Sequence, residues 1–176
     1  MSGAHRLCLI SICCLGAGLL APFAGATGNR SISSLGDLNA GVIAQLNVIR
    51  AEYRLPPLTA DQSLAAAARQ HTTEMLLDGY FAHTSSGGGA FWKRLQLFYP
   101  PGQGSWSVGE NLLWSSGALD SKRAVELWMA SPEHRANILN PAWRVIGVSS
   151  EKAFGAPGTY GGRTVVVITT DFGARS

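Results

Sequence analysis

Apolar side chains recur every three or four positions between Leu38 and Tyr53. That spacing places them on one face of an α-helix, and we predict a helix over Asp37–Tyr53. The prolines of Leu55-Pro56-Pro57 end it, because a residue before proline avoids helical backbone angles. The preceding residues 27–36 are rich in Ser, Gly and Asn, and we expect a flexible leader there.

An alanine-rich segment follows, and both of its ends carry helix signals. Thr59 and Gln62 have the spacing of a capping box, which predicts the start of a second helix. Gly79 suits the left-handed cap that ends many helices. A Ser/Gly loop then separates this helix from a short one predicted over Ala90–Phe98.

The second half of the chain combines helices with β segments. Helices are predicted over Ser121–Ala130 and from Pro132 to Leu139. Arg144–Lys152 and Thr164–Phe172 read as strands joined by a Gly/Pro-rich hairpin turn. The second of these is apolar at consecutive positions, so we expect helices on both faces of the sheet. The predicted class is α+β, with helices layered on a small sheet.

Residues 1–26 have the composition of a secretory signal peptide. Arg6 precedes an apolar run, and Ala24-Gly25-Ala26 fits the small-x-small cleavage pattern. The run is shorter than the roughly 20 residues of a membrane-spanning helix, which favours a signal peptide over an N-terminal anchor. We therefore expect a secreted protein, periplasmic or extracellular, without a stable membrane span after cleavage.

Cleavage after Ala26 would remove every cysteine of the chain, because Cys8, Cys13 and Cys14 all precede it. The mature domain would then fold without disulfides, by packing alone. It would also lose Arg6, which lowers the formal charge from +3 to +2. So small a charge gives no reason to expect nucleic acid or an anionic membrane as a partner.

Three side chains outside the apolar pattern can carry chemistry. His83 follows the second helix, Glu110 lies on a loop or short strand, and His134 lies in the last predicted helix. Two imidazoles and a carboxylate suit zinc or another divalent ion, with water in an open position, but His83 and His134 lie 51 positions apart and show no ligand spacing signature. The alternative is a hydrogen-bonded polar cleft that holds no metal.

Other polar and aromatic residues have simpler interpretations. Ser131 precedes Pro132, and a capping hydroxyl explains it better than a nucleophile paired with His134. His71 lies on the apolar face of the second helix, which favours a packed histidine or a cleft wall over a ligand. Trp128 is expected in the core.

The order of these motifs resembles the CAP superfamily. These are the cysteine-rich secretory proteins, antigen-5 and pathogenesis-related proteins of class 1, also called SCP-like, and the likeness is to their cysteine-free bacterial branch. It is carried by Gly-Glu-Asn-Leu at 109–112 and Trp-x-x-Ser-Pro-x-His-Arg-x-Asn-Ile-Leu at 128–139. Phe81-Ala82-His83-Thr84 and Ile146-Gly147-Val148 support it. The likeness spans about residues 38–172, within a domain placed at 37–173.

The resemblance implies an α-β-α sandwich with a small antiparallel sheet flanked by helices. It also implies a surface cleft with two histidines and two glutamates. His83, Glu110 and His134 match three of these positions, and Ser131 stands where the family has its second glutamate. The expected cleft is therefore His83, Glu110, His134 and Ser131, with the first three as metal ligands. The set is therefore one glutamate short of the family's four residues.

The functional expectation is a secreted binding or interaction module rather than an enzyme, with no catalytic residue assigned. Its ligand would be zinc or another divalent metal, or a small lipid-like molecule such as a sterol. The resemblance also leaves open a metal-assisted, peptidase-like hydrolase that uses the same cleft, with Glu110 as ligand or general base. A structural envelope protein is a third class, because one fold serves many functions.

Overall fold

The computed structural model describes residues 31–176, so the predicted signal peptide lies outside the described residues. Within this range no helix is both long and apolar enough to cross a membrane. The helices are α1 (Gly36–Glu52), α2 (Gln62–Asp78), α3 (Phe91–Phe98), α4 (Ser121–Ala130) and α5 (Pro132–Ile138), with a 3₁₀ turn η1 at Gly158–Tyr160. The strands are β1 (Ile32–Ser34), β2 (Thr59–Ala60), β3 (Trp106–Ser115), β4 (Val145–Ala156) and β5 (Arg163–Arg175).

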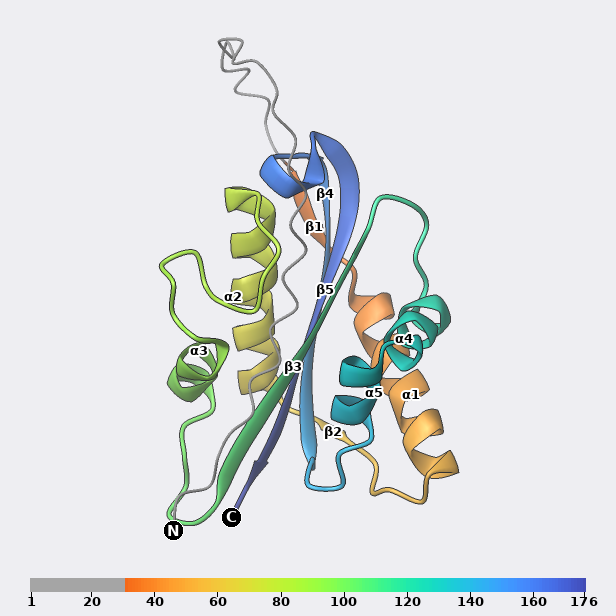
Figure 1. Ribbon diagram of the computed structural model, residues 1–176, viewed down its shortest axis with the longest axis vertical. Helices are drawn as coiled ribbons and strands as arrows, with labels where there is room; N and C mark the ends of the chain where they lie inside the picture. The colour runs from red at the N-terminus through yellow and green to blue at the C-terminus, as the bar shows by residue number, and fades with distance from the viewer. Residues whose placement is uncertain (1–30) are drawn as a thin grey trace.

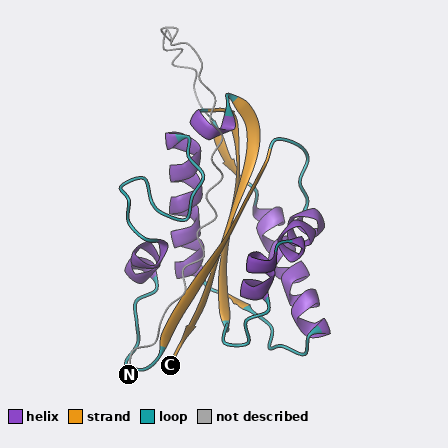
Figure 2. Cartoon of the chain, in the orientation of Figure 1, coloured by secondary structure: helices purple, strands orange, loops and turns teal. Residues whose placement is uncertain are grey.

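The strands form one sheet between two layers of helices. Its order is β1-β4-β5-β3, and the short β2 pairs with β4 off this path. All pairs are antiparallel except β2 with β4. Helices α2 and α3 cover one face, and α1, α4 and α5 cover the other (Figure 1; helices and strands are distinguished in Figure 2). The predicted α+β class and the α-β-α sandwich are confirmed.

The core explains why β5 is apolar at consecutive positions. Val166 and Ile168 pack in the cluster shared with α1, α4 and α5, whereas Val165 and Val167 pack in the cluster shared with α2. Successive side chains of a strand point to opposite faces, so a central strand between two helical layers must be apolar on both. Trp128 is 1% exposed and lies in the first of these clusters, as predicted.

The strands at the sheet edges differ from the prediction. Ile32–Ser34 falls in the expected flexible leader but forms β1, which pairs with Glu151–Ala153 of β4. For Trp106–Ser115 the sequence predicts a loop followed by a loop or short strand, yet this segment pairs with β5 along ten residues. Both segments carry polar residues without a clean alternation. Pairing with a neighbouring strand decides their conformation, which local propensity does not show.

The caps of two helices also differ from the prediction. Thr59 belongs to β2, and the N-cap of α2 is Asp61, whose carboxylate accepts a hydrogen bond from Leu64 N at 2.9 Å. Ser131 does occupy the N-cap position of α5, but its hydroxyl makes no capping hydrogen bond. It lies 3.4 Å from a carboxylate oxygen of Glu133 instead. The predicted cap at Gly79 is confirmed, with a left-handed φ of 73°.

These two N-caps give a matched test of what the side chain contributes. Asp61→Ala is expected to lower the free energy of unfolding by about 1 kcal/mol, because it removes a formed capping bond. Ser131→Ala is expected to change it by less than about 0.5 kcal/mol, since no such bond exists there. Urea denaturation of both variants measures the difference. Equal losses in the two proteins would contradict the assignment of the caps.

Candidate functional site

The triplet Gly109-Glu110-Asn111 lies on β3, the edge strand, and serves both helical layers. Leu112 packs in the cluster on the α2 side, so Glu110, two residues earlier, points to the same face. Asn111 points to the opposite face, toward α5. Two adjacent residues of one strand therefore reach the two layers that hold the expected histidines.

On the α5 side the triplet anchors the helix that carries His134. Asn111 Nδ2 donates to the backbone carbonyl of His134 at 3.2 Å, and Asn111 Oδ1 accepts from Asn137 Nδ2 at 3.0 Å. A Cβ at Gly109 would lie 2.6 Å from Asn137 Oδ1 and 2.8 Å from a ring carbon of Trp143. A side chain at position 109 would therefore displace the Asn137 amide and the Trp143 ring.

On the α2 side the carboxylate of Glu110 contacts an imidazole and a guanidinium. One of its oxygens lies 2.8 Å from His83 Nδ1, and the other is hydrogen-bonded to the guanidinium of Arg94 on α3. The side chain of Glu110 is fully buried and that of Arg94 is 3% exposed, whereas His83 is 52% exposed. A buried ion pair thus supports an imidazole at the surface.

A second carboxyl lies beside Glu110, and the sequence does not predict it. Asp171 is its cross-strand partner on β5, is 0% exposed, and accepts no hydrogen bond from a donor in the described part of the chain. Burial raises the pKa of Asp171 well above its usual value, and the neighbouring Glu110 charge raises it further. Burial likewise raises the pKa of Glu110 to about 7, against the opposing effect of Arg94. Two such carboxyls are satisfied together when they share one proton.

Two buried side chains hold the turn that presents His83, by hydrogen bonds to its backbone carbonyls. Buried His71 donates from Nε2 to the carbonyl of Ala82 at 2.8 Å, and Tyr160 donates to the carbonyl of Tyr80 at 2.8 Å. Burial lowers the pKa of His71 to about 4, so the ring is neutral at neutral pH. His71 is thus a packed histidine that anchors the turn, one of the two roles predicted for it.

The ring of His83 is oriented by its contacts. Nδ1 faces the Glu110 carboxylate, and the ring meets Phe91 edge-on at 6.4 Å between centroids. Nδ1 therefore carries the proton, and Nε2 keeps a free lone pair. Nε2 makes no hydrogen bond with another described residue. Burial lowers the pKa of His83, and the Arg94 charge lowers it further.

His134 lies near enough to His83 for the two rings to influence each other. Its pKa is lowered first by burial and then by the charge of His83. The structure therefore brings His83, Glu110 and His134 into one neighbourhood. It leaves Ser131 outside the hydrogen-bonded network, with Glu133 as its side-chain neighbour. A pocket at the opposite edge of the sheet is lined by none of these four.

The donor set limits what ion these residues would fit. Glu110 has given one oxygen to His83 and the other to Arg94, so it orients an imidazole rather than facing outward. Within residues 31–176 no group of three or more His, Cys, Asp or Glu side chains is arranged to hold a metal ion. Two imidazoles suit a divalent ion only if water completes its coordination.

The sequence alone does not predict the roles of Arg94 and Asp171. Asp171 had a usable signal, because it is a lone acid within an apolar strand, where an unpaired charge is destabilising. Arg94 has no such signal in the sequence. It follows Lys93 in a short amphipathic helix, where a solvent-exposed side chain is the ordinary interpretation. Only the packing of α3 against β3 shows that it is buried.

Comparison with known proteins identifies a family. The model of the cysteine-rich secretory protein family, CAP, matches residues 43–168. The uncharacterized Bacillus subtilis protein YkwD is 33% identical over 116 residues. That match covers 66% of this chain and 43% of YkwD, so the chain spans less than half the length of this relative.

Solved structures share the fold. An extracellular SCP-domain protein from Bacillus anthracis superposes with a TM-score of 0.59 at 29% identity, over 80% of this chain and 41% of that one. An outer surface protein from Borrelia burgdorferi superposes with a TM-score of 0.65 at 18% identity, over 82% of this chain and 98% of that one. At 18% identity the second match shows the fold alone.

Proposed function

The chain belongs to the cysteine-rich secretory protein (CAP) family, and we propose that it is an extracytoplasmic binding module whose ligand contacts the imidazoles of His83 and His134. The location is supported by the signal-peptide pattern of residues 1–26 and by the relative from Bacillus anthracis, which is described as extracellular. YkwD and the Bacillus anthracis protein are longer than this chain, so the proposal concerns the CAP domain.

The observation that carries this function is the buried Arg94–Glu110 pair beneath an exposed histidine. Burying two charges opposes folding, and well-packed apolar residues of similar volume often stabilise a fold as well or better. Here the pair fixes the tautomer and direction of a surface ring. A carboxylate behind a histidine is the usual support of a ring that binds something through its other nitrogen.

The ligand class that this geometry favours is a divalent cation. His83 Nε2 and an imidazole nitrogen of His134 would hold it, and Glu110 would act through His83 rather than bind directly. Such an ion would polarise groups bound to it, and water would fill its remaining positions. Ser131 contributes no ligand in this proposal. With two protein ligands, the affinity is expected to be weak.

Zinc titration of the purified protein tests this role. His83→Ala and His134→Ala are each expected to remove most of the affinity, whereas Glu110→Gln should weaken binding by roughly 10- to 100-fold through the loss of ring support. Ser131→Ala is the matched control and should bind like the unmodified protein. Protons compete for both rings, so binding should be strongest at about pH 7.5 and lost at about pH 5. Burial lowers the pKa of both rings, which keeps them neutral somewhat below the usual histidine range.

Calorimetry measures these affinities directly. Undiminished zinc binding in a protein that lacks both imidazoles would sink the proposal. A lipid or sterol is the other ligand class that we propose from the family resemblance, and the aromatic edge of Phe91 beside His83 would be its contact. Hydrolysis is favoured less, because a general base must reach its substrate and the Glu110 side chain is fully buried.

A further inference from the structure

The outer edge of β4 is covered at two places and open between them. β2 pairs with Val145 and Ile146, and β1 pairs with Glu151 and the two residues after it. The four residues 147–150 between these pairings have no described strand beside them on the outer edge. Open edges present unpaired backbone groups that can pair with another chain.

The backbone groups that face this opening belong to Val148. Ile146 O accepts from Asp61 N at 2.8 Å, and Ser150 O accepts from Leu35 N at 2.9 Å, so both carbonyls point outward. Backbone groups of a strand alternate in direction, and Val148 therefore also presents its N–H and C=O outward. No backbone or side-chain group in residues 31–176 bonds them on that side.

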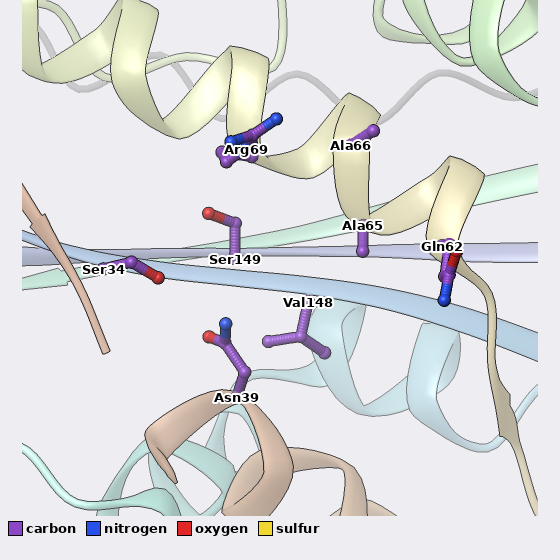
Figure 3. A pocket seen from close by; sticks show the side chains of 8 residues that line it. All are labelled: Ser34, Asn39, Gln62, Ala65, Ala66, Arg69, Val148 and Ser149. Carbon is purple, nitrogen blue, oxygen red and sulfur yellow. The ribbon is translucent and has the colours of Figure 1, made fainter. Parts of the chain in front are cut away.

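A pocket of about 270 Å³ lies at this opening (Figure 3). Ser149 is only 4% exposed, has no hydrogen-bond partner among the described residues, and points its hydroxyl toward Arg69. On the other side, Asn39 Oδ1 is buried and has no partner within residues 31–176. Buried polar groups are normally satisfied, so the unpartnered oxygen of Asn39 indicates a polar molecule that binds here. The lining residues are Ser34, Asn39, Gln62, Ala65, Ala66, Arg69, Val148 and Ser149.

Arg69 gives the pocket a positive charge. Its guanidinium forms no ion pair with a carboxylate in the described part of the chain. The charge of Arg69 acts on Glu151, where it opposes the rise in pKa that burial causes. The carboxyl of Glu151 is buried and accepts a hydrogen bond from Thr73 at 2.8 Å. A guanidinium at the mouth of a polar pocket favours a carboxylate as its partner.

We propose that a short extended peptide with an acidic side chain binds at this opening as an added strand. Its backbone pairs with Val148, and its carboxylate reaches Arg69 and Ser149. The residue next to the acid points to the opposite face, toward Asn39, because side chains alternate along a strand. This is the strand-addition mode, in which backbone bonds give affinity and pockets give specificity. The proposal is independent of His83, which lies beside β3 at the other edge of the sheet.

Acetyl-Ala-Glu-Ala-amide is a suitable probe, titrated into isotope-labelled protein and followed by NMR. The Val148 amide is expected to shift and to exchange its proton with solvent more slowly when the peptide is bound. Arg69→Gln should weaken binding at least about tenfold, since it removes one charge-assisted contact. Replacing the peptide glutamate with glutamine should weaken binding similarly, and Arg69→Gln should then have no further effect.

Arg163→Gln is the matched control, because Arg163 is an exposed arginine of β5 outside the pocket, and it should leave binding unchanged. His83→Ala should also leave it unchanged, which separates this site from the proposed cation site. The proposal is overturned if Arg69→Gln binds the peptide as well as the unmodified protein does. It is also overturned if glutarate alone binds equally well, since glutarate has no backbone amides that can pair as a strand.

Discussion

Replacing Gly147 by alanine is expected to lower the free energy of unfolding by about 3 kcal/mol. A Cβ at this position would lie 2.1 Å from both Leu64 C and Ala65 N, which are backbone atoms of α2. No rotamer change relieves such a contact, so the helix must move away from β4 and loosen the layer around Leu64. In a domain of this size the loss corresponds to a midpoint lowered by roughly 6–12 °C.

Gly87→Ala provides the control, because a Cβ there meets no atom within 4 Å and the backbone φ is not positive. Thermal and urea denaturation of both variants, with the urea m-value checked for two-state behaviour, measure the difference. A loss below about 1 kcal/mol for Gly147→Ala would show that α2 does not lie as close to β4 as described.

Replacing Arg94 by methionine is expected to destabilise the protein by roughly 3–5 kcal/mol at about pH 7, because buried carboxylates then lose their cation. The loss should shrink at about pH 5. Burial raises the pKa of Glu110 to about 7 and that of Asp171 well above its usual value. Acids with a raised pKa bind more protons in the folded state than in the unfolded state. The free energy of unfolding that they cost is therefore absent in acid and grows as the pH rises from about 4 toward 7.

Removing Arg94 raises both of these pKa values further, since its charge lowers them in the intact protein. It also removes the charge that lowers the pKa of His83, which adds to the recovery in acid.

Arg50→Met is the matched control. Arg50 is 0% exposed and donates to the carbonyls of Pro56, Ile138, Asn140 and Trp143, with no carboxylate among its hydrogen-bond partners in the described chain. Its replacement should also destabilise the fold, but by an amount that differs little between the two pH values. Urea titrations of the three proteins at both pH values decide the matter. A pH-independent loss in Arg94→Met would contradict the proposed charge pairing.

The parts of the fold that could be predicted are those that local sequence determines. The helix predicted over Asp37–Tyr53 is observed as α1 at Gly36–Glu52, because its face repeats at helical spacing. The hairpin of β4 and β5 is likewise visible in two apolar runs around a Gly/Pro-rich turn. By contrast, β1 is three residues long and β3 lacks alternation, so only their neighbours specify them.

The candidate site divides in the same way. His83, Glu110 and His134 stand in recognisable motifs, and the structure places the three near one another. Their roles could not be predicted from the sequence, because the role of Glu110 depends on which groups bind its two carboxylate oxygens. Arg94 on α3 donates a hydrogen bond to one of them. Asp171 lies opposite Glu110 on β5, 61 positions later in the chain. Such contacts between distant segments have no local signature.

The opposite orientations of Glu110 and Asn111 have a consequence for folding. A slip of β3 by one residue against β5 would exchange the two faces of the strand. Glutamate would then point toward α5 without Arg94, and asparagine would replace it behind His83. An edge strand paired on one side only has few other means of holding its register. The contacts of the site therefore favour the native register of the sheet. A chain that pairs β3 out of register loses the contact of Glu110 with His83 and the contact of Asn111 with the His134 backbone at the same time.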